Sequence, residues 1–405
     1  MTMTPTRPAT AMQWVETHAT AEDTATALAD ACARFTSAFG DESPDLLLVF
    51  FTSHHVPAAE LISETLKARL RPGCLAGVSG GAVVTTAQEI ESGPALVLVG
   101  ARMPDVAVRP FILVPSAWGE AMTDAAEFER HTPGLVGAEL VLLLGDPFTL
   151  DIERVLRSFH EYSPGVRVVG GMASAGMRPS ANALILNDWV AHEGGIGIAL
   201  SGALRVDVVV SQGCRPIGPA LTVTRAENNM VYELDGQPAL ERTEQVLRDL
   251  GEREKGMLQH GLYVGRPARG DASGRGDYLI RNLLGADRDQ GVMAVGDRVP
   301  EREKVRLHVR DADTAREDLE LLLAPQEFDG RAAGALVFTC TGRGRQLFGV
   351  PDRDLTTLQR ALGGDVPTAG FFCAGEIGPV GARSFLHGHT ASIAIVRPRG
   401  AADTR

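Results

Sequence analysis

The sequence lacks the features that mark several common classes of protein. Its five cysteines are scattered, with no pair in the C-x-x-C spacing of a structural zinc site, and they predict reduced thiols rather than a disulfide framework. No apolar run approaches the roughly 20 residues that a membrane-spanning helix needs. Residues 1–10 are polar and have no apolar core like that of a signal peptide. These absences together predict a cytoplasmic protein.

The sequence also has fewer positive than negative side chains: it contains 39 lysines and arginines and 51 aspartates and glutamates, which gives a formal net charge of −12. This balance argues against non-specific binding to nucleic acid or to an anionic membrane. The phosphate-binding pattern G-x-x-x-x-G-K-[ST] is absent, and no G-x-G-x-x-G lies between a predicted strand and a predicted helix. His54 and His55 would point to opposite faces of a strand, with no acidic or cysteine partner at ligand spacing. We therefore predict neither a cofactor nor a bound metal.

The composition is that of a globular protein, with 405 residues, 44% of them hydrophobic and 22% charged, enough for two or three domains. Three segments share one order of features: an uninterrupted apolar run, a polar loop, a helical stripe of apolar residues, a second apolar run and a glycine turn. From loop to turn they are residues 52–80, 145–170 and 339–370. Apolar runs of this kind are typical of strands that are covered on both faces. The recurrence predicts an internal duplication.

Each segment is predicted to form a strand, a helix, a second strand and a returning strand or hairpin, which makes a mixed sheet. A weaker unit is predicted in 261–309, where a helix would begin at Asp277 and bury Leu279, Ile280, Leu283 and Leu284. The predicted fold class is therefore α/β (α+β, mixed sheets), with two pseudo-repeated domains that are each built from two strand-helix-strand-strand units.

The domain boundaries follow from these patterns. Residues 1–40 are predicted to form a frayed tail up to about Ala19 and then a helix, and residues 41–211 the first domain. Residues 212–236 are predicted to be a loose junction, residues 237–397 the second domain and residues 398–405 a C-terminal tail.

The loop after the first strand of the last unit is the richest in chemical groups. Cys340 supplies a thiol, Thr341 a hydroxyl and Arg343 a fixed cation, while Gly342 allows a ligand to approach the backbone closely. A guanidinium can hold a carboxylate or a phosphate through two hydrogen bonds. Because ligands of α/β folds commonly bind at the carboxyl ends of strands, we predict a binding site here. The alternative is an exposed glycine turn with solvated arginines.

The end of the partner strand is expected to lie near this loop, and it adds Cys373, Gly375 and Glu376 to the predicted ligand-binding residues. A carboxylate of Glu376 beside the guanidinium of Arg343 is either half of a site for a zwitterion, such as an amino acid, or a structural ion pair. The sequence leaves both open.

A catalytic role for Cys340 would need a lowered thiol pKa and a nearby base, which His387 or His389 could supply. No motif of a known cysteine-enzyme class is present. We therefore predict no catalytic residue.

Several of these motifs resemble those of one family. Residues 338–344 together with 369–379 look like the C-terminal FIST domain. Residues 170–174, which end at Ser174, and residues 212–218 resemble the end of the N-terminal FIST domain and its junction. The resemblance covers roughly residues 45–397. It implies a FIST N-terminal domain in the first predicted domain and a FIST C-terminal domain in the second, and Ser174 joins the predicted ligand-binding residues.

FIST proteins are regarded as sensory modules of bacterial signal transduction, proposed to bind small ligands such as amino acids, and the domain also occurs beside F-boxes in eukaryotes. The resemblance therefore implies a sensor of an amino acid or another small carboxylate. No F-box or signalling output segment is recognisable, so we expect a stand-alone sensor that acts through a protein partner. Two alternatives stay open: a protein-interaction scaffold without a small ligand, and a thiol-dependent enzyme that uses Cys340.

Overall fold

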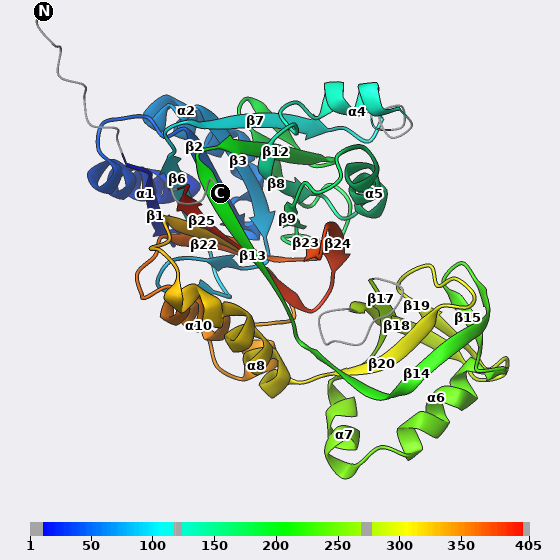
Figure 1. Ribbon diagram of the computed structural model, residues 1–405. Coiled ribbons are helices and arrows are strands. Elements are labelled where there is room, and N and C mark those ends of the chain that lie inside the picture. The colour runs from blue at the N-terminus through cyan, green and yellow to red at the C-terminus, as the bar shows by residue number, and fades with distance from the viewer. Residues whose placement is uncertain (1–10, 117, 119–123, 269–277, 400–405) are drawn as a thin grey trace, which may run out of the picture.

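A computed structural model describes residues 11–116, 118, 124–268 and 278–399. These residues form three six-stranded sheets, which together make one body, and a seven-stranded sheet of which six strands close into a barrel (Figure 1). The barrel forms a second lobe. Because each of the three sheets combines parallel and antiparallel strands, the predicted α/β class with mixed sheets is confirmed.

The order of strands across each six-stranded sheet departs from their order in the chain. The first sheet contains, from edge to edge, β1 (Gln13–Ala19), β6 (Leu96–Arg102), β2 (Leu46–Thr52), β3 (Cys74–Gly80), β10 (Leu184–Leu186) and β11 (Trp189–Ala191). The second contains β24 (Arg383–His387), β23 (Glu376–Val380), β9 (Val168–Met172), β8 (Ala138–Gly145), β12 (Gly195–Gly202) and β7 (Val106–Leu113). The third contains β13 (Leu204–Gln212), β25 (Thr390–Pro398), β21 (Gly334–Cys340), β22 (Thr368–Cys373), β4 (Val83–Val84) and β5 (Glu89–Ile90).

Each sheet is built around one of the three predicted units. The parallel pairs are β2 with β3, β8 with β9, and β21 with β22. They are connected through α2 (Ala59–Leu70), α5 (Ile152–Tyr162) and α10 (Arg353–Ala361). In each unit an antiparallel strand then returns beside the first strand: β6, β12 and β25. The three units share this topology; their origin by duplication stays a prediction.

The hairpins of the units are exchanged in a cycle. Strand β10, which follows the second unit's β9, pairs with β3 of the first unit. Strand β23 of the third unit pairs with β9 of the second, and β4 of the first unit pairs with β22 of the third. Every unit therefore completes the sheet of another.

Successive side chains along each apolar run point alternately into two different cores. In β2, Leu46, Leu48 and Phe50 point into a central core that also receives side chains from the other two sheets, including Phe338 and Phe371. The rings of Phe50 and Phe371 stack with centroids 5.6 Å apart. The alternate residues of β2 pack under the outer helices α1 (Thr24–Phe39) and α2. The inner strands are apolar throughout because both of their faces are buried.

Helices cover the outer faces of the other two sheets as well. These are α4 (Ala125–His131) and α5 on the second sheet, and α8 (Ala312–Leu323) and α10 on the third. Among the described residues, shorter helical segments are α9 (Arg345–Phe348) and the 3-10 turns η1 (Ser53–Ala58), η2 (Leu258–His260) and η4 (Ala324–Phe328). No helix in the described part of the chain is both long enough and apolar enough to span a bilayer.

The barrel corrects the prediction of a further helical unit in 261–309. Its six strands are β14 (Cys214–Glu227), β20 (Lys304–Arg310), β17 (Leu262–Pro267), β18 (Tyr278–Asp287), β19 (Val292–Val295) and β15 (Met230–Leu234). The pairing of β14 with β15 closes the ring, and the short strand β16 (Gln237–Pro238) pairs with β15 outside it. Residues 278–287 form β18 rather than a helix, and Asp277 lies outside the described residues. The C-terminal half therefore contains one strand-helix-strand unit and a barrel.

Strand pairing overrides the helical spacing in β18, because β17 and β19 hydrogen-bond to it from both sides. The barrel core packs against α6 (Ala239–Arg248) through Val246, and α7 (Glu252–Met257) follows on the same lobe.

Two other expectations were wrong. Residues 13–19 form the edge strand β1, paired with β6, instead of a frayed tail. Residues 212–236 form mainly the long strand β14 and β15 instead of a loose junction; β13 and β14 together run from the three-sheet body to the barrel (Figure 1). Burial along β1 and β14 does not alternate regularly, so neither strand shows a period of two in its sequence.

The contact between β21 and β22 predicts the effect of a single methyl group. A Cβ added at Gly370 would lie 1.8 Å from the carbonyl oxygen of Val337, so Gly370→Ala must separate the two strands. We expect the free energy of unfolding, measured by urea denaturation, to fall by about 1–3 kcal/mol or more. The control is Gly330→Ala, where the added Cβ meets no atom within 4 Å and a change below about 0.5 kcal/mol is expected. Equal effects of the two substitutions would contradict the prediction.

Candidate functional site

The ends of β21 and β22 carry the residues that the sequence motifs indicate. Cys340 ends β21 and Cys373 ends β22, and they are direct partners in the parallel pair. Arg343 follows in the turn before α9, and Glu376 begins β23. The side chains of Arg343 and Glu376 are fully buried and interact electrostatically, and the backbone of His389 hydrogen-bonds to the Cys340 thiol. Cys340, Arg343, Glu376 and His389 form what we call the strand-end cluster.

Arg343 has a carboxylate partner within its own unit. Its Nε lies 2.7 Å from Oδ2 of Asp354 and its Nη2 lies 2.8 Å from Oδ1. Asp354 lies in the first turn of α10, and its Oδ2 also accepts a hydrogen bond from Thr339 at 3.2 Å. The structural ion pair that the sequence left open therefore exists, but with Asp354 instead of Glu376. The third nitrogen of Arg343, Nη1, is buried without a partner among the described residues.

Glu376 is held at one carboxylate oxygen only. Its Oε2 accepts hydrogen bonds from the Thr390 backbone N–H, at 3.1 Å, and from the Thr390 hydroxyl, at 2.8 Å. Its Oε1 is buried and has no partner in the described part of the chain. Burial raises the pKa of the Glu376 carboxyl to about 8, because the charged form loses its hydration.

The register of the three exchanged hairpins shows that the fold does not require a carboxylate at this position. Glu376 pairs with Gly171 in the second sheet. The matching positions of the other two hairpins are Leu184, which pairs with Val78, and Val83, which pairs with Phe371. Both are buried and apolar. Glu376 is thus a polar exception in a place that apolar residues fill elsewhere.

Arg310 completes the cluster from the barrel, and the sequence motifs did not indicate it. It ends β20, is 9% exposed, and donates from Nη2 to the carbonyl oxygen of Gly342. It also hydrogen-bonds to the side chain of Tyr263. Within residues 11–116, 118, 124–268 and 278–399 it has no carboxylate partner, and its Nε is buried without a partner. A buried guanidinium without a counter-ion is costly in a protein interior.

The thiols of Cys340 and of its strand partner Cys373 are neutral near pH 7. Burial raises the pKa of the Cys340 thiol to about 12 and the pKa of the Cys373 thiol well above its usual value. Burial also lowers the pKa of His387 and of His389 to about 4, which leaves both imidazoles weakly basic. His387 is further engaged, because its Nε2 lies 2.9 Å from the carbonyl oxygen of Gly378. The arrangement lacks the lowered thiol pKa that a cysteine nucleophile needs.

The other predicted ligand-binding residues surround the cluster and tie its backbone together. Ser174 accepts a hydrogen bond from the Gly81 backbone N–H at 2.8 Å and donates to the carbonyl oxygen of Phe372, so it joins all three units. Thr341 is exposed, and its N–H donates to the Cys373 carbonyl. A Cβ at Gly342 would meet the Arg310 guanidinium at 3.1 Å, and one at Gly375 would meet Leu386 at 2.8 Å.

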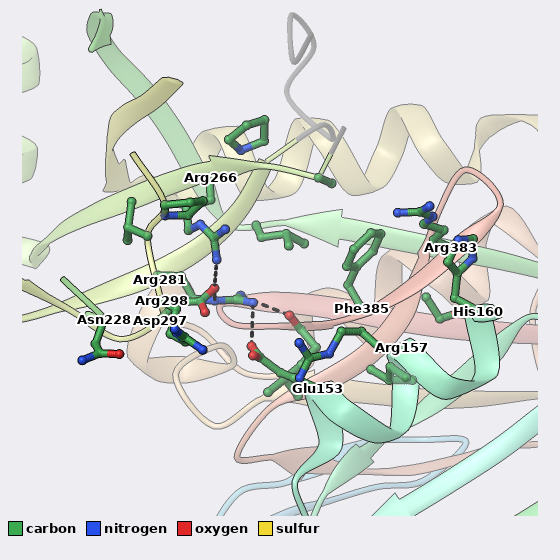
Figure 2. A pocket seen from close by; sticks show the side chains of 18 of the residues that line it. Glu153, Arg157, His160, Asn228, Arg266, Arg281, Asp297, Arg298, Arg383 and Phe385 are labelled. Carbon is green, nitrogen blue, oxygen red and sulfur yellow. Dashed lines mark hydrogen bonds and ion pairs between the residues drawn. The ribbon is translucent and has the colours of Figure 1, made fainter. Parts of the chain in front are cut away.

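A separate cavity of about 670 Å³ lies where the barrel meets α5 and the β23–β24 hairpin (Figure 2). We call it the junction pocket. Its walls come from segments that are far apart in the sequence, and no residue of the strand-end cluster lines it. No sequence motif pointed to it.

The chain matches the models of two protein domains over most of its length. The FIST N domain matches residues 45–237, and the FIST C domain matches residues 239–379. The chain belongs to the FIST family.

Its relatives include an uncharacterised protein of Mycobacterium tuberculosis strain CDC 1551, 37% identical over 383 residues, which cover 93% of this chain and 96% of that protein. A second, from M. tuberculosis strain H37Rv, is 36% identical over 380 residues, or 93% of this chain and 97% of that protein. Two solved structures of cyanuric acid hydrolase, one of them from A. caulinodans, are similar over 96% of this chain and 100% of theirs, at 10% identity. Their TM-scores of 0.33 and 0.32 support no conclusion about this FIST protein.

FIST domains are associated with sensory signal transduction, so the general part of the predicted function is confirmed. The class of ligand and the roles of the individual site residues stay predictions. No group of three or more histidine, cysteine, aspartate or glutamate side chains in the described residues could hold a metal ion.

The buried ion pair predicts a large effect of removing Arg343. Arg343→Ala leaves Asp354, which is 2% exposed, without its partner, and should lower the free energy of unfolding by about 3–5 kcal/mol. Arg345→Ala in the same loop removes an exposed guanidinium and should change it by less than about 0.5 kcal/mol. Urea denaturation measures both, and a loss below about 1 kcal/mol for Arg343→Ala would contradict the structural role of the pair.

The raised pKa of Glu376 predicts a pH dependence of stability. The folded protein binds this proton more tightly than the unfolded chain does, since the pKa is about 8 in one and about 4.5 in the other. The stabilisation is fully present below pH 4.5 and is lost as the pH rises through 8. Glu376→Gln should therefore be more stable than the native protein at pH 8.5, by roughly 1–3 kcal/mol more than at pH 5. Burial also raises the pKa of Glu89 to about 8, so part of the dependence of the free energy of unfolding on pH should remain in the variant. If Glu376→Gln shows the same pH dependence as the native protein, the prediction is contradicted.

Proposed function

We propose that this FIST protein is a sensory protein that binds a small carboxylate, with an amino acid as the best match, at the strand-end cluster and Arg310. The observation that carries the proposal is the buried guanidinium of Arg310, which lacks a counter-ion among the described residues. A ligand carboxylate would supply that counter-ion. Arginine side chains are well suited to this role, because a guanidinium binds a carboxylate through charge-assisted hydrogen bonds.

The unpartnered atoms of the cluster match the two ends of an amino acid. The Nε of Arg310 and the Nη1 of Arg343 are donors, and a carboxylate accepts from both. The Oε1 of Glu376 is an acceptor, and an α-ammonium group donates to it. Asp354 neutralises the charge of Arg343, so Arg310 provides the net positive charge for the carboxylate.

The cluster lies beneath a contact between the body and the barrel. His389, after β24, is half-buried, and its Nε2 lies 3.0 Å from Oδ1 of Asn282 in β18. Its ring also packs edge-on against Tyr263 of β17, with centroids 4.4 Å apart. We infer that a ligand enters when this contact opens. Binding would then change the position of the barrel relative to the body, which is the kind of two-state response that a sensor transmits to a partner.

The alternative of a thiol-dependent enzyme has less support, since Cys340 is neutral and buried. A neutral thiol suits a role as a polar contact for a ligand better than a role as a nucleophile.

A thermal-shift screen against amino acids and small carboxylates tests the proposal. A ligand at 100 times its Kd stabilises the protein by about 2.7 kcal/mol, which is a readily measured rise in Tm. Arg310→Met keeps the length of the side chain but removes the donors, so the shift should disappear while the Tm without ligand is retained or raised. Arg360→Met, on the exposed face of α10, should behave like the native protein. A screen without any shift would favour the scaffold, and a shift that persists in Arg310→Met would place the ligand elsewhere.

The pH dependence of binding distinguishes an amino acid from a simple carboxylate. An ammonium group binds the ionised form of Glu376, whose pKa is raised to about 8, so the affinity for an amino acid should increase from pH 6 to pH 8. The affinity for the matching carboxylate without an amino group should not increase, because it gains nothing from the ionised form. Titration calorimetry at the two pH values measures the difference.

A further inference from the structure

The junction pocket lies next to the hairpin that carries Glu376, yet the proposed amino-acid site does not use it. It lies between α5, the ends of β17 and β18, the segment after β19, and β24. Its volume of about 670 Å³ falls in the range of small-molecule sites. Five arginines and only two carboxylates line it, although the whole chain has a net charge of −12.

Two of the arginines form the fixed wall of the pocket. Arg281 lies 2.8 Å from Asp297 and 3.3 Å from Glu153 on α5, and it donates at 3.1 Å to the carbonyl oxygen of Leu386 in β24. Arg266 shares Asp297 at 2.5 Å and binds Glu303 with two hydrogen bonds, at 2.6 and 2.9 Å. These contacts connect the barrel, the helix α5 and the β23–β24 hairpin. Both carboxylates of the lining, Glu153 and Asp297, are paired with these two arginines.

The side chains of the other three arginines, Arg157, Arg298 and Arg383, make no ion pair or hydrogen bond with any residue that the structure describes. The Nδ1 atom of His160, in the same lining, is buried and likewise has no partner there. Counter-charges for the three cations are thus missing from the pocket itself. An anion bound there would gain from several guanidinium donors at once.

The cations stand on both sides of an aromatic side chain. In Figure 2, Phe385 of β24 lies between Arg298, which follows β19 of the barrel, and Arg383 and His160. The guanidinium of Arg157 of α5 extends toward Glu153 in this view. Leu156, Leu279 and Val299 add apolar surface to the lining. The pocket thus offers an apolar middle and a positive charge toward each end.

We propose that the junction pocket binds a small organic molecule with two separated anionic groups, carboxylate or phosphate. One group pairs with Arg298 of the barrel and the other with Arg383 of the body, while the connecting carbon atoms lie against Phe385 and Arg157 adds positive charge to the wall formed by α5. The ligand therefore ties the barrel to the body across the same junction that Arg281 spans. This site is distinct from the amino-acid site and does not depend on it.

Titration calorimetry with paired probes tests the proposal on the full chain. Adipate and fructose 1,6-bisphosphate carry two anionic groups; hexanoate and fructose 6-phosphate are their counterparts with one. We expect at least one of the first two to bind, and to bind more than tenfold more tightly than its counterpart. Which of the two binds decides between carboxylate and phosphate. Arg298→Ala and the double variant Arg157→Ala/Arg383→Ala should each weaken binding by about 10- to 100-fold, and higher ionic strength should weaken it in the native protein.

The matched control is Arg360→Ala, an exposed arginine on α10, which should bind the probe like the native protein. The substituted positions 157, 298, 360 and 383 are all exposed, and circular dichroism verifies that these variants fold. Binding of neither double-headed probe would overturn the proposal, and so would equal affinity for the single-headed counterparts. An undiminished affinity in Arg298→Ala would overturn the bridging of the two lobes. Arg310→Met should leave probe binding unchanged, so a failure of the amino-acid site and a failure of this one are distinguishable.

Discussion

None of the three sheets is complete within its own unit. The open edges of β3, β9 and β22 are each covered by a hairpin from a different unit, and these pairings close a cycle. A sheet edge left open exposes a row of unpaired backbone groups. The central core, to which all three sheets contribute, therefore exists only when the whole cycle is closed. The position of Glu376 follows from this exchange, because it lies on the exchanged strand β23.

Much of this body can be predicted from the sequence, because its strands are buried on both faces and appear as uninterrupted apolar runs. The runs at β2, β8 and β21, their polar loops and their helical stripes are local patterns. The barrel is harder. Leu279, Ile280, Leu283 and Leu284 have helical spacing, but two neighbouring strands make them part of β18. Long-range pairing of this kind leaves no periodic trace in a single segment.

The candidate site likewise contains residues that can be predicted from the sequence and residues that cannot. Cys340, Arg343, Cys373 and Glu376 stand at strand ends that belong to one unit, so their proximity follows from the connection between parallel strands. The partner of Arg343 is Asp354, on the helix of that connection. Arg310 could not be found from the sequence, because it stands out only through its burial and the absence of a counter-ion among the described residues. The junction pocket combines six separate segments of the chain, none of which is unusual alone.

The three units also show how a common framework acquires a site. Glycines at matching positions, Gly170 and Gly370, allow the second strand of the second and third units to approach the first strand, where an added Cβ would lie 1.8 Å from a carbonyl oxygen. These positions serve the framework. At the matching position of the exchanged hairpins, two units have the apolar residues Leu184 and Val83, whereas the third has the buried carboxyl group of Glu376.

The cyclic exchange also has a consequence for the order in which the chain assembles. Val83 pairs with Phe371, and β13 finds its partner β25 only at Thr390–Pro398. The partner of the hairpin β4–β5 of the first unit is strand β22 of the last unit. During synthesis the hairpin therefore stays without this partner strand until nearly the whole chain has emerged. Contacts of such high sequence separation slow folding and lengthen the exposure of apolar strands. The protein should therefore depend on the folding machinery of the cell more than its size alone would require.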